Sequence, residues 1–254
     1  MENQLVPPPE VLKLAAHPVR WNLLTRLARS DYRVQELVEQ LQLPQNLVSY
    51  HLRQLRDGHL VLEHRSTADE RAIYYGLDIV QFRHDLFLAG RQLHPAIPAN
   101  SADSEDKPVA HRPLRVLFLC TENSARSQMA EGLLRQLGQG NFEAASAGSQ
   151  PAEQVHPLAL RVMQQVGIDM SRAIPKHVST LQGQHFDAIV TVCDRVREVC
   201  PTFADEPERI HWSFPDPALA EGSEETLYYA FEQTSLQLAT RIRLLMTLLE
   251  SEKG

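Results

Sequence analysis

Cysteine is scarce in this sequence, and the few cysteines are unevenly distributed. Only three occur among 254 residues, at positions 120, 193 and 200, and none precedes residue 120. This excludes the dense disulfide framework of a small secreted domain. Thiols at these positions that cycle between reduced and oxidised forms would require a reducing compartment, so we expect a cytoplasmic protein.

Long apolar runs are also missing. No stretch of 18 apolar residues occurs, and no charged-then-apolar leader opens the chain, so neither a membrane span nor a signal peptide is predicted. The formal net charge is −7, yet residues 1–94 carry equal numbers of basic and acidic side chains. A nucleic-acid-binding surface in that half must therefore be local, and is reinforced if two copies of the chain pair.

Two domains joined by a tether are predicted from the length and the composition. A chain of 254 residues that is 43% hydrophobic can bury two cores. Residues 95–113 are rich in Pro, Ala, Ser, Asp and Glu and lack apolar periodicity, which is typical of a flexible linker. We therefore assign an N-terminal domain to residues 1–94 and a C-terminal domain to residues 114–254.

The N-terminal half has the order of a winged helix-turn-helix. Helical patterns at 11–16, 18–29, 34–41 and 45–57 precede two strand-like runs at 60–65 and 71–75 and a final helix at 78–93. This order predicts an α+β domain whose helix 45–57 enters the DNA major groove.

Polar groups on that helix and arginines at the wing tip suit base edges and phosphates. A solvated helix face is the alternative for any single residue, and Tyr50 and His51 could equally pack against the core. The predicted DNA-binding residues are Gln45, Asn46, Ser49, Tyr50, His51, Arg53, Arg56, Arg65 and Arg71.

The C-terminal half opens with a strand-like run at 114–119, a loop that begins at Cys120, and a helical pattern. Backbone N–H groups at the start of a helix bind a tetrahedral anion, and the Arg126 guanidinium can hold two of its oxygens. Both features should lower the pKa of the Cys120 thiol. A small buried hydrophobe that closes the strand is the alternative for this cysteine. The predicted oxyanion loop comprises Thr121, Glu122, Asn123, Ser124, Ala125, Arg126 and Ser127.

Four stretches of this half resemble the low-molecular-weight tyrosine phosphatase superfamily and, within it, the thiol-dependent arsenate reductases. They are VLFLCTENSARSQMAEGLL (116–134), SAGSQPAEQVHPLALRVMQQVGID (146–169), VTVCDRVREVCP (190–201) and IHWSFPDPA (210–218). Residues 8–93 resemble the ArsR-type repressors through HPVR (17–20), LVSYHL (47–52) and LRDG (55–58). The resemblances imply an α/β domain with a parallel sheet after a DNA-binding domain. They also imply an operator DNA as partner and a homodimer formed through the N-terminal domain.

Cys193 and Cys200 favour the reductase over the phosphatase, which needs neither thiol. A structural disulfide or half of a zinc site is the alternative reading of this pair. The resemblance implies that arsenate forms an adduct with Cys120 and that Cys193 and Cys200 relay a disulfide to an external dithiol. That dithiol would be thioredoxin or glutathione with glutaredoxin. The predicted catalytic residues are Cys120, Arg126, Cys193, Cys200 and Asp216, with Asp216 as the general acid.

No tightly bound cofactor and no metal site are predicted. Asn123, Glu131 and Ser146 match positions that hold a monovalent cation in some of these reductases, although structural hydrogen bonding is the alternative. Glu122 stands where many relatives have Gly, and it either weakens oxyanion binding or points outward. Residues 1–119 contain no cysteine, so the N-terminal domain cannot capture trivalent arsenic with thiolates of its own.

The sequence thus predicts a bifunctional transcriptional regulator and arsenate reductase. One alternative is a low-molecular-weight protein phosphatase fused to a regulator. The other is a non-catalytic repressor in which the loop senses an oxyanion or arsenic.

Overall fold

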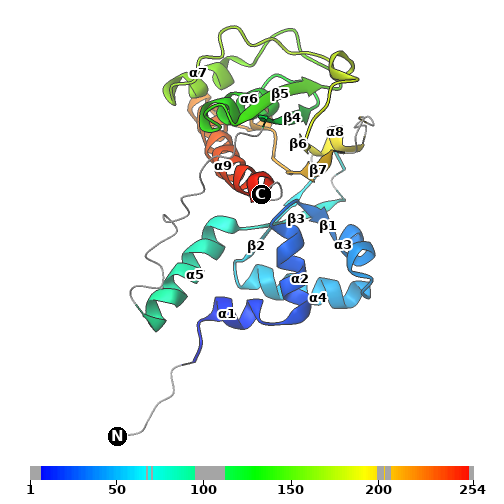
Figure 1. Ribbon diagram of the computed structural model, residues 1–254, viewed down its shortest axis with the longest axis vertical. Helices are drawn as coiled ribbons and strands as arrows, with labels where there is room; N and C mark the ends of the chain where they lie inside the picture. Colours follow the sequence, from blue (N-terminus) through cyan, green and yellow to red (C-terminus); the bar gives the residue numbers. More distant parts are fainter. Residues whose placement is uncertain are drawn as a thin grey trace, which may run out of the picture. The chain divides into compact units, whose positions relative to one another are not determined.

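The computed structural model describes residues 7–66, 68–69, 71–94, 112–198, 203 and 207–251. They form two compact units, one with the elements α1 to α5 and the other with β4 to α9 (Figure 1). The predicted linker 95–113 lies outside the described residues except for its last two positions, so the predicted domain boundaries stay a prediction. Cys200 also lies outside the described residues.

The N-terminal unit combines five helices with a small antiparallel sheet. The helices described there are α1 (Glu10–Ala15), α2 (Pro18–Leu27), α3 (Val34–Leu41), α4 (Gln45–Asp57) and α5 (Ile79–Leu93). The strands pair in the order β1-β3-β2 and comprise β1 (Tyr32–Arg33), β2 (Val61–Arg65) and β3 (Ile73–Leu77). The predicted winged helix-turn-helix is confirmed, and the short strand β1 is an addition that the sequence pattern did not indicate.

Local sequence explains where α2 begins and how α4 is oriented. His17 caps α2, because its Nδ1 accepts a hydrogen bond from the Val19 amide, and Pro18 occupies the first helical position. The apolar residues of α4 recur at helical spacing, and Val48 and Leu55 are fully buried. The opposite face of α4 is therefore free for solvent or a ligand.

The C-terminal unit is built on a four-stranded parallel sheet of order β5-β4-β6-β7. Its strands are β4 (Leu114–Cys120), β5 (Phe142–Gly148), β6 (Ala188–Thr191) and β7 (Glu208–His211). Its helices are α6 (Arg126–Leu137), α7 (Pro157–Gln165), α8 (Asp194–Glu198) and α9 (Glu224–Ser251), with short 3-10 turns η1 (Val178–Leu181) and η2 (Pro217–Leu219). The predicted α/β class is confirmed.

Burial explains why the sheet is parallel and where its site lies. Residues 116–119 of the central strand β4 are 0% exposed, as expected for a strand covered on both faces. The helix α9 packs against α6 and α7 (Figure 1). It buries Phe231, Leu238 and Ile242. Although α9 has 28 residues, no helix in the described part of the chain is long and apolar enough to cross a membrane. The carboxyl ends of all four strands meet at one edge, where open α/β sheets bind ligands.

Candidate active site and DNA-binding surface

The loop between β4 and α6 wraps around the sulfur of Cys120. This thiol is 3% exposed, its Sγ accepts a hydrogen bond from the Asn123 amide at 3.1 Å, and Ser127 Oγ lies 2.9 Å away. The turn requires a left-handed residue, because Asn123 has a φ of 50°. It also requires Gly148 on the neighbouring strand, because a Cβ there would lie 2.5 Å from the Thr121 carbonyl oxygen.

Asn123 is the hydrogen-bonding centre that supports this loop. Its buried Nδ2 donates to Ser127 Oγ at 2.9 Å and to Ser146 Oγ at 2.8 Å. Its Oδ1 accepts from Gln128 Nε2 at 3.1 Å and from the Lys176 amide at 2.9 Å. Because Ser127 Oγ already accepts from Asn123, its own hydrogen is available for the Cys120 sulfur.

Burial changes the expected electrostatics of Cys120. Burial raises the pKa of this thiol above its ordinary value, and the neighbouring Cys193 raises it further. The Arg126 guanidinium, the Ser127 hydroxyl and the Asn123 amide lower it, but they do not outweigh burial. The predicted lowering of the Cys120 pKa is therefore wrong, because burial outweighs the effects that lower it.

Arg126 and Asp216 meet across the mouth of the loop. Arg126 is 7% exposed, its Nη1 donates to the Phe214 carbonyl oxygen at 2.9 Å, and its Nη2 donates to Asp216 Oδ2 at 2.5 Å. Asp216 also accepts from the Ala218 amide at 3.1 Å, which holds its carboxylate at the start of η2. These contacts bring together two residues that are 90 positions apart in the sequence.

Cys193 lies on the other side of the same pocket. It follows β6, is 1% exposed, and its Sγ lies 3.4 Å from Thr121 Oγ1. Both described cysteines are free thiols. The pocket has a volume of about 40 Å³ and is lined by Cys120, Thr121, Glu122, Ser124, Ala125, Arg126, Cys193, Arg195, Asp216 and Leu219.

The structure resolves the orientation of Glu122 and adds residues to the pocket. Glu122 is exposed at the rim, and its Oε2 accepts a hydrogen bond from Ser124 Oγ at 3.1 Å. Sequence reasoning missed Arg195 and Leu219 as lining residues, because they lie just beyond the predicted Cys193 and Asp216 and no motif marks them. Asn123 and Ser127 belong to the predicted loop but support it from behind.

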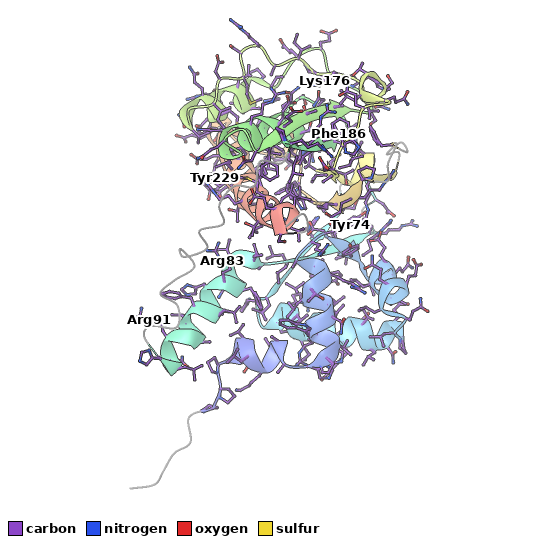
Figure 2. All side chains as sticks on the ribbon, in the orientation of Figure 1. Tyr74, Arg83, Arg91, Lys176, Phe186 and Tyr229 are labelled. Carbon is purple, nitrogen blue, oxygen red and sulfur yellow. The ribbon has the colours of Figure 1, made fainter. Side chains whose placement is uncertain are left out.

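The three residues predicted to hold a monovalent cation are neighbours behind the loop. Asn123 donates to Ser146, and Ser146 Oγ donates to Glu131 Oε2 at 2.5 Å. Lys176 Nζ lies 3.5 Å from the same carboxylate oxygen, and Arg135 Nη2 lies 2.6 Å from the other. Lys176, labelled in Figure 2, belongs to the segment between α7 and η1. Two side-chain cations therefore already compensate the buried Glu131.

Other sites for metals and ligands were sought among the described residues. None of their His, Cys, Asp and Glu side chains form a group of three or more that could hold a metal ion. A larger cavity of about 690 Å³ lies beside α6 and is lined by Glu131 and Lys176 among others, but it does not reach Cys120. The described residues that were predicted to be catalytic therefore line the smaller pocket, not the larger cavity.

Most of the predicted DNA-binding residues lie on the outward face of α4 or at the wing. Those exposed are Gln45, Asn46, Ser49, Tyr50, Arg53, Arg65 and Arg71, and Arg56 is half-buried with its Nη1 bonded to Glu63 of β2 at 2.9 Å. The outward orientation predicted for His51 is wrong. It is 4% exposed, with its ring centroid 4.3 Å from that of His17, and burial lowers its pKa.

Two family models match the sequence. Residues 115–254 match the low molecular weight phosphotyrosine protein phosphatase model, and residues 17–61 match the bacterial regulatory protein, arsR family. The chain therefore belongs to the low molecular weight phosphotyrosine protein phosphatase family, and its N-terminal unit is an arsR-family helix-turn-helix domain.

Individual relatives are arsenate reductases. One from Halalkalibacterium halodurans is 38% identical over 128 residues, which span 50% of this chain and 91% of that protein. One from Bacillus subtilis is 35% identical over 128 residues with the same coverage. Among solved structures, the thioredoxin-dependent arsenate reductase of Corynebacterium glutamicum is 22% identical, with a TM-score of 0.46, and the match covers 91% of this chain and 98% of that one.

Proposed function

We propose that this chain is a cytoplasmic protein that combines an arsenate reductase with a transcriptional regulator. The enzyme proposal rests on one observation, the pocket that Cys120, Arg126, Asp216 and Cys193 line together. A phosphatase of this fold would use the first three residues and would have no need of the fourth. The second thiol beside the nucleophile therefore favours a redox reaction, and the likeness to arsenate reductases supplies the substrate.

Arsenate binding would use the loop amides and the Arg126 guanidinium. Two of the five N–H groups of Arg126 contact Phe214 and Asp216, which leaves three for an oxyanion. The pocket volume of about 40 Å³ exceeds the roughly 10–15 Å³ that one water needs, and it suits a small tetrahedral ion. Glu122 at the rim opposes anions through its charge, but its exposed carboxylate is screened by solvent.

In the first chemical step, the Cys120 sulfur attacks arsenic. Because burial raises the pKa of this thiol, its proton passes to an oxygen of the bound arsenate before the attack, and the Ser127 hydroxyl then stabilises the thiolate. Asp216 donates a proton to the departing oxygen, which leaves as water. The product is an adduct with a bond between sulfur and As(V).

In the second step, the sulfur of Cys193 attacks the sulfur of Cys120. A disulfide forms, and the electron pair of the broken sulfur–arsenic bond stays on arsenic, which is reduced from As(V) to As(III). The proton of the Cys193 thiol leaves with arsenite. Cys200 then exchanges onto Cys193, and an external dithiol such as thioredoxin or glutaredoxin reduces the resulting disulfide.

The reductase is tested by following arsenate consumption with a thioredoxin system beside hydrolysis of an aryl phosphate. We expect repeated turnover of arsenate by the wild-type chain and none by Cys193→Ser. Aryl-phosphate turnover without arsenate reduction would instead support the phosphatase alternative. Turnover of neither substrate, together with tight arsenate binding, would support a non-catalytic sensor.

The N-terminal unit would bind an operator as a homodimer. The exposed face of α4 carries Asn46, Ser49 and Arg53, which suit base edges and phosphates in a major groove. Exposed apolar side chains on α1 and α5, including Leu12 and Phe87, supply the material for a dimer interface.

Any response of DNA binding to arsenic would have to arise in the C-terminal unit, because residues 1–119 contain no thiol. The test compares operator binding by the reduced, oxidised and arsenite-treated chain with binding by a fragment that ends near residue 94. We expect only the full chain to respond. An equal response of the fragment would locate sensing in the N-terminal unit, and no response in either would leave the two units functionally independent.

A further inference from the structure

A buried polar cluster lies directly beside Cys193, and the reaction proposed above does not use it. Asp194, the first residue of α8, is 2% exposed and accepts hydrogen bonds from His211 Nε2 at 3.1 Å and from Ser213 Oγ. The other ring nitrogen of His211 lies 2.8 Å from Thr191 Oγ1. The cluster therefore joins the end of β6, the start of α8 and the end of β7.

Asp194 is the charged member of this cluster. Burial by itself raises the pKa of a carboxyl group, but hydrogen bonds, chiefly from His211 and Ser213, and the charge of His211 lower the pKa of Asp194 to about 2. An ionised carboxylate only accepts hydrogen bonds, so His211 Nε2 must carry a hydrogen. A buried charge is held strictly in place, because moving it away from its donors leaves it uncompensated.

The Asp194 carboxylate lies between two parts of the proposed site, the thiol of Cys193 and the segment that follows β7. Cys193 is the preceding residue, so the path of its backbone follows from where Asp194 is held. Ser213 is followed by Phe214, whose carbonyl oxygen accepts the hydrogen bond from Arg126. Asp194 thus connects the second thiol to the segment that leads to Asp216.

We propose that Asp194 is a positioning residue for the second chemical step. Through His211 and Ser213 it holds Cys193 so that its sulfur faces the sulfur of Cys120. The inference rests on the proposed function, because the step exists only in a reductase. In that step the new bond joins the two sulfurs, the sulfur–arsenic bond breaks with its electron pair on arsenic, and the thiol proton leaves with arsenite. Asp194 touches none of the reacting atoms.

The expected effect is selective for this step. A displacement of about 1 Å between reacting groups costs roughly a hundredfold in rate, so Asp194→Asn should slow disulfide formation by about 10- to 100-fold. Asparagine preserves the shape of the side chain but removes its charge, so a weaker, neutral acceptor replaces the Oδ1 that accepts from both His211 and Ser213. Adduct formation uses Cys120, Arg126 and Asp216. Because Phe214 and Asp216 are also held by their own hydrogen bonds with Arg126 and the Ala218 amide, this step should change by less than about twofold.

The test uses the full-length chain carrying Cys200→Ser, in which the proposed reaction stops at the Cys120–Cys193 disulfide. Arsenate is added, samples are quenched with an alkylating agent, and the linked peptides are quantified over time by mass spectrometry. The rate with Asp194→Asn is compared with the rate without it. Adduct formation is followed separately in the Cys193→Ser background, by protection of Cys120 from alkylation.

Two further variants keep the result interpretable. Ser213→Ala removes one donor to Asp194 with less disturbance, and it should slow disulfide formation in the same direction even if Asp194→Asn fails to fold. Ser235→Ala is the matched control, because it removes a buried hydroxyl of α9 whose partner is the sulfur of Met163, and it should change neither rate.

Three outcomes would count against the inference. Equal slowing of both steps would mean that Asp194 supports the fold without positioning the thiol. An unchanged rate of disulfide formation in Asp194→Asn, or in Ser213→Ala if the first variant does not fold, would also overturn it. If the Cys200→Ser parent forms no Cys120–Cys193 disulfide, the proposed relay fails and this inference fails with it.

Discussion

Replacing Asn123 by alanine should destabilise the C-terminal unit and loosen the anion loop at the same time. The side chain is 0% exposed and makes four hydrogen bonds, with Ser127, Ser146, Gln128 and the Lys176 amide. At about 1 kcal/mol for each bond, the loss is roughly 4 kcal/mol before any relaxation. Alanine at a φ of 50° adds about 1 kcal/mol of backbone strain.

Water that enters the vacated space would recover part of this energy, so we expect the free energy of unfolding to fall by about 3–5 kcal/mol. Asn123→Gly loses the same hydrogen bonds without the strain, and it should be about 1 kcal/mol more stable than Asn123→Ala. The exposed Asn141 is a matched control in the same unit, and Asn141→Ala should change the value by less than about 0.5 kcal/mol.

The chain offers a simple assay, because it has two tryptophans, one in each unit. In a Trp21→Phe background, urea unfolding followed by fluorescence reports on the buried Trp212 alone. A loss below about 1 kcal/mol in Asn123→Ala, with m-values unchanged, would refute the reasoning that these hydrogen bonds hold the loop. An equal effect of Ala and Gly would refute the strain argument only.

Four further predictions concern Asp216 as the general acid, the Lys176 ammonium beside Glu131, the role of Asp194 in stability at low pH, and operator binding by Arg53. Asp216→Asn should slow adduct formation by about 100- to 10,000-fold with little change in arsenate affinity, and lost affinity at an unchanged rate would contradict its role as general acid. Lys176→Ala should make arsenate reduction respond to potassium, because the ammonium 3.5 Å from Glu131 is gone, and an equal response of the wild-type chain would argue against this. The pKa of Asp194 in the folded chain, about 2, is below its ordinary 3.8, so its stabilisation is present above about pH 4 and lost as the pH falls toward 2. Asp194→Asn should therefore flatten that part of the stability curve measured by tryptophan fluorescence, and an unchanged acid limb would exclude this role. Arg53→Ala should weaken operator binding by about 5- to 100-fold in fluorescence anisotropy at fixed salt, and unaltered binding would remove it from the interface.

Features encoded in contiguous residues could be predicted from the sequence. The strand, loop and helix around Cys120 follow one another directly, and the change from strand to helical periodicity marks each boundary. The buried face of α9 was predictable for the same reason, because Phe231, Leu238 and Ile242 recur at helical spacing. These signals depend only on near neighbours in the chain.

Features that depend on distant residues could not be predicted. The contact between Lys176 and Glu131 has no local signature, because it exists only once the segment after α7 lies beside α6. A helical pattern placed His51 outward, but it could not show that the ring of His17 would cover it. The pKa of Cys120 was misjudged because the sequence displays the nearby guanidinium and not the degree of burial.

In the proposed reaction, the ion pair between Arg126 and Asp216 would connect substrate capture with the role of the general acid. The guanidinium that would hold arsenate is the same group that holds the Asp216 carboxylate in the structure. An incoming arsenate would therefore compete with this carboxylate for the N–H groups of Arg126. Capture of the oxyanion would in this way release Asp216 from its partner at the moment when the reaction needs it beside the departing oxygen.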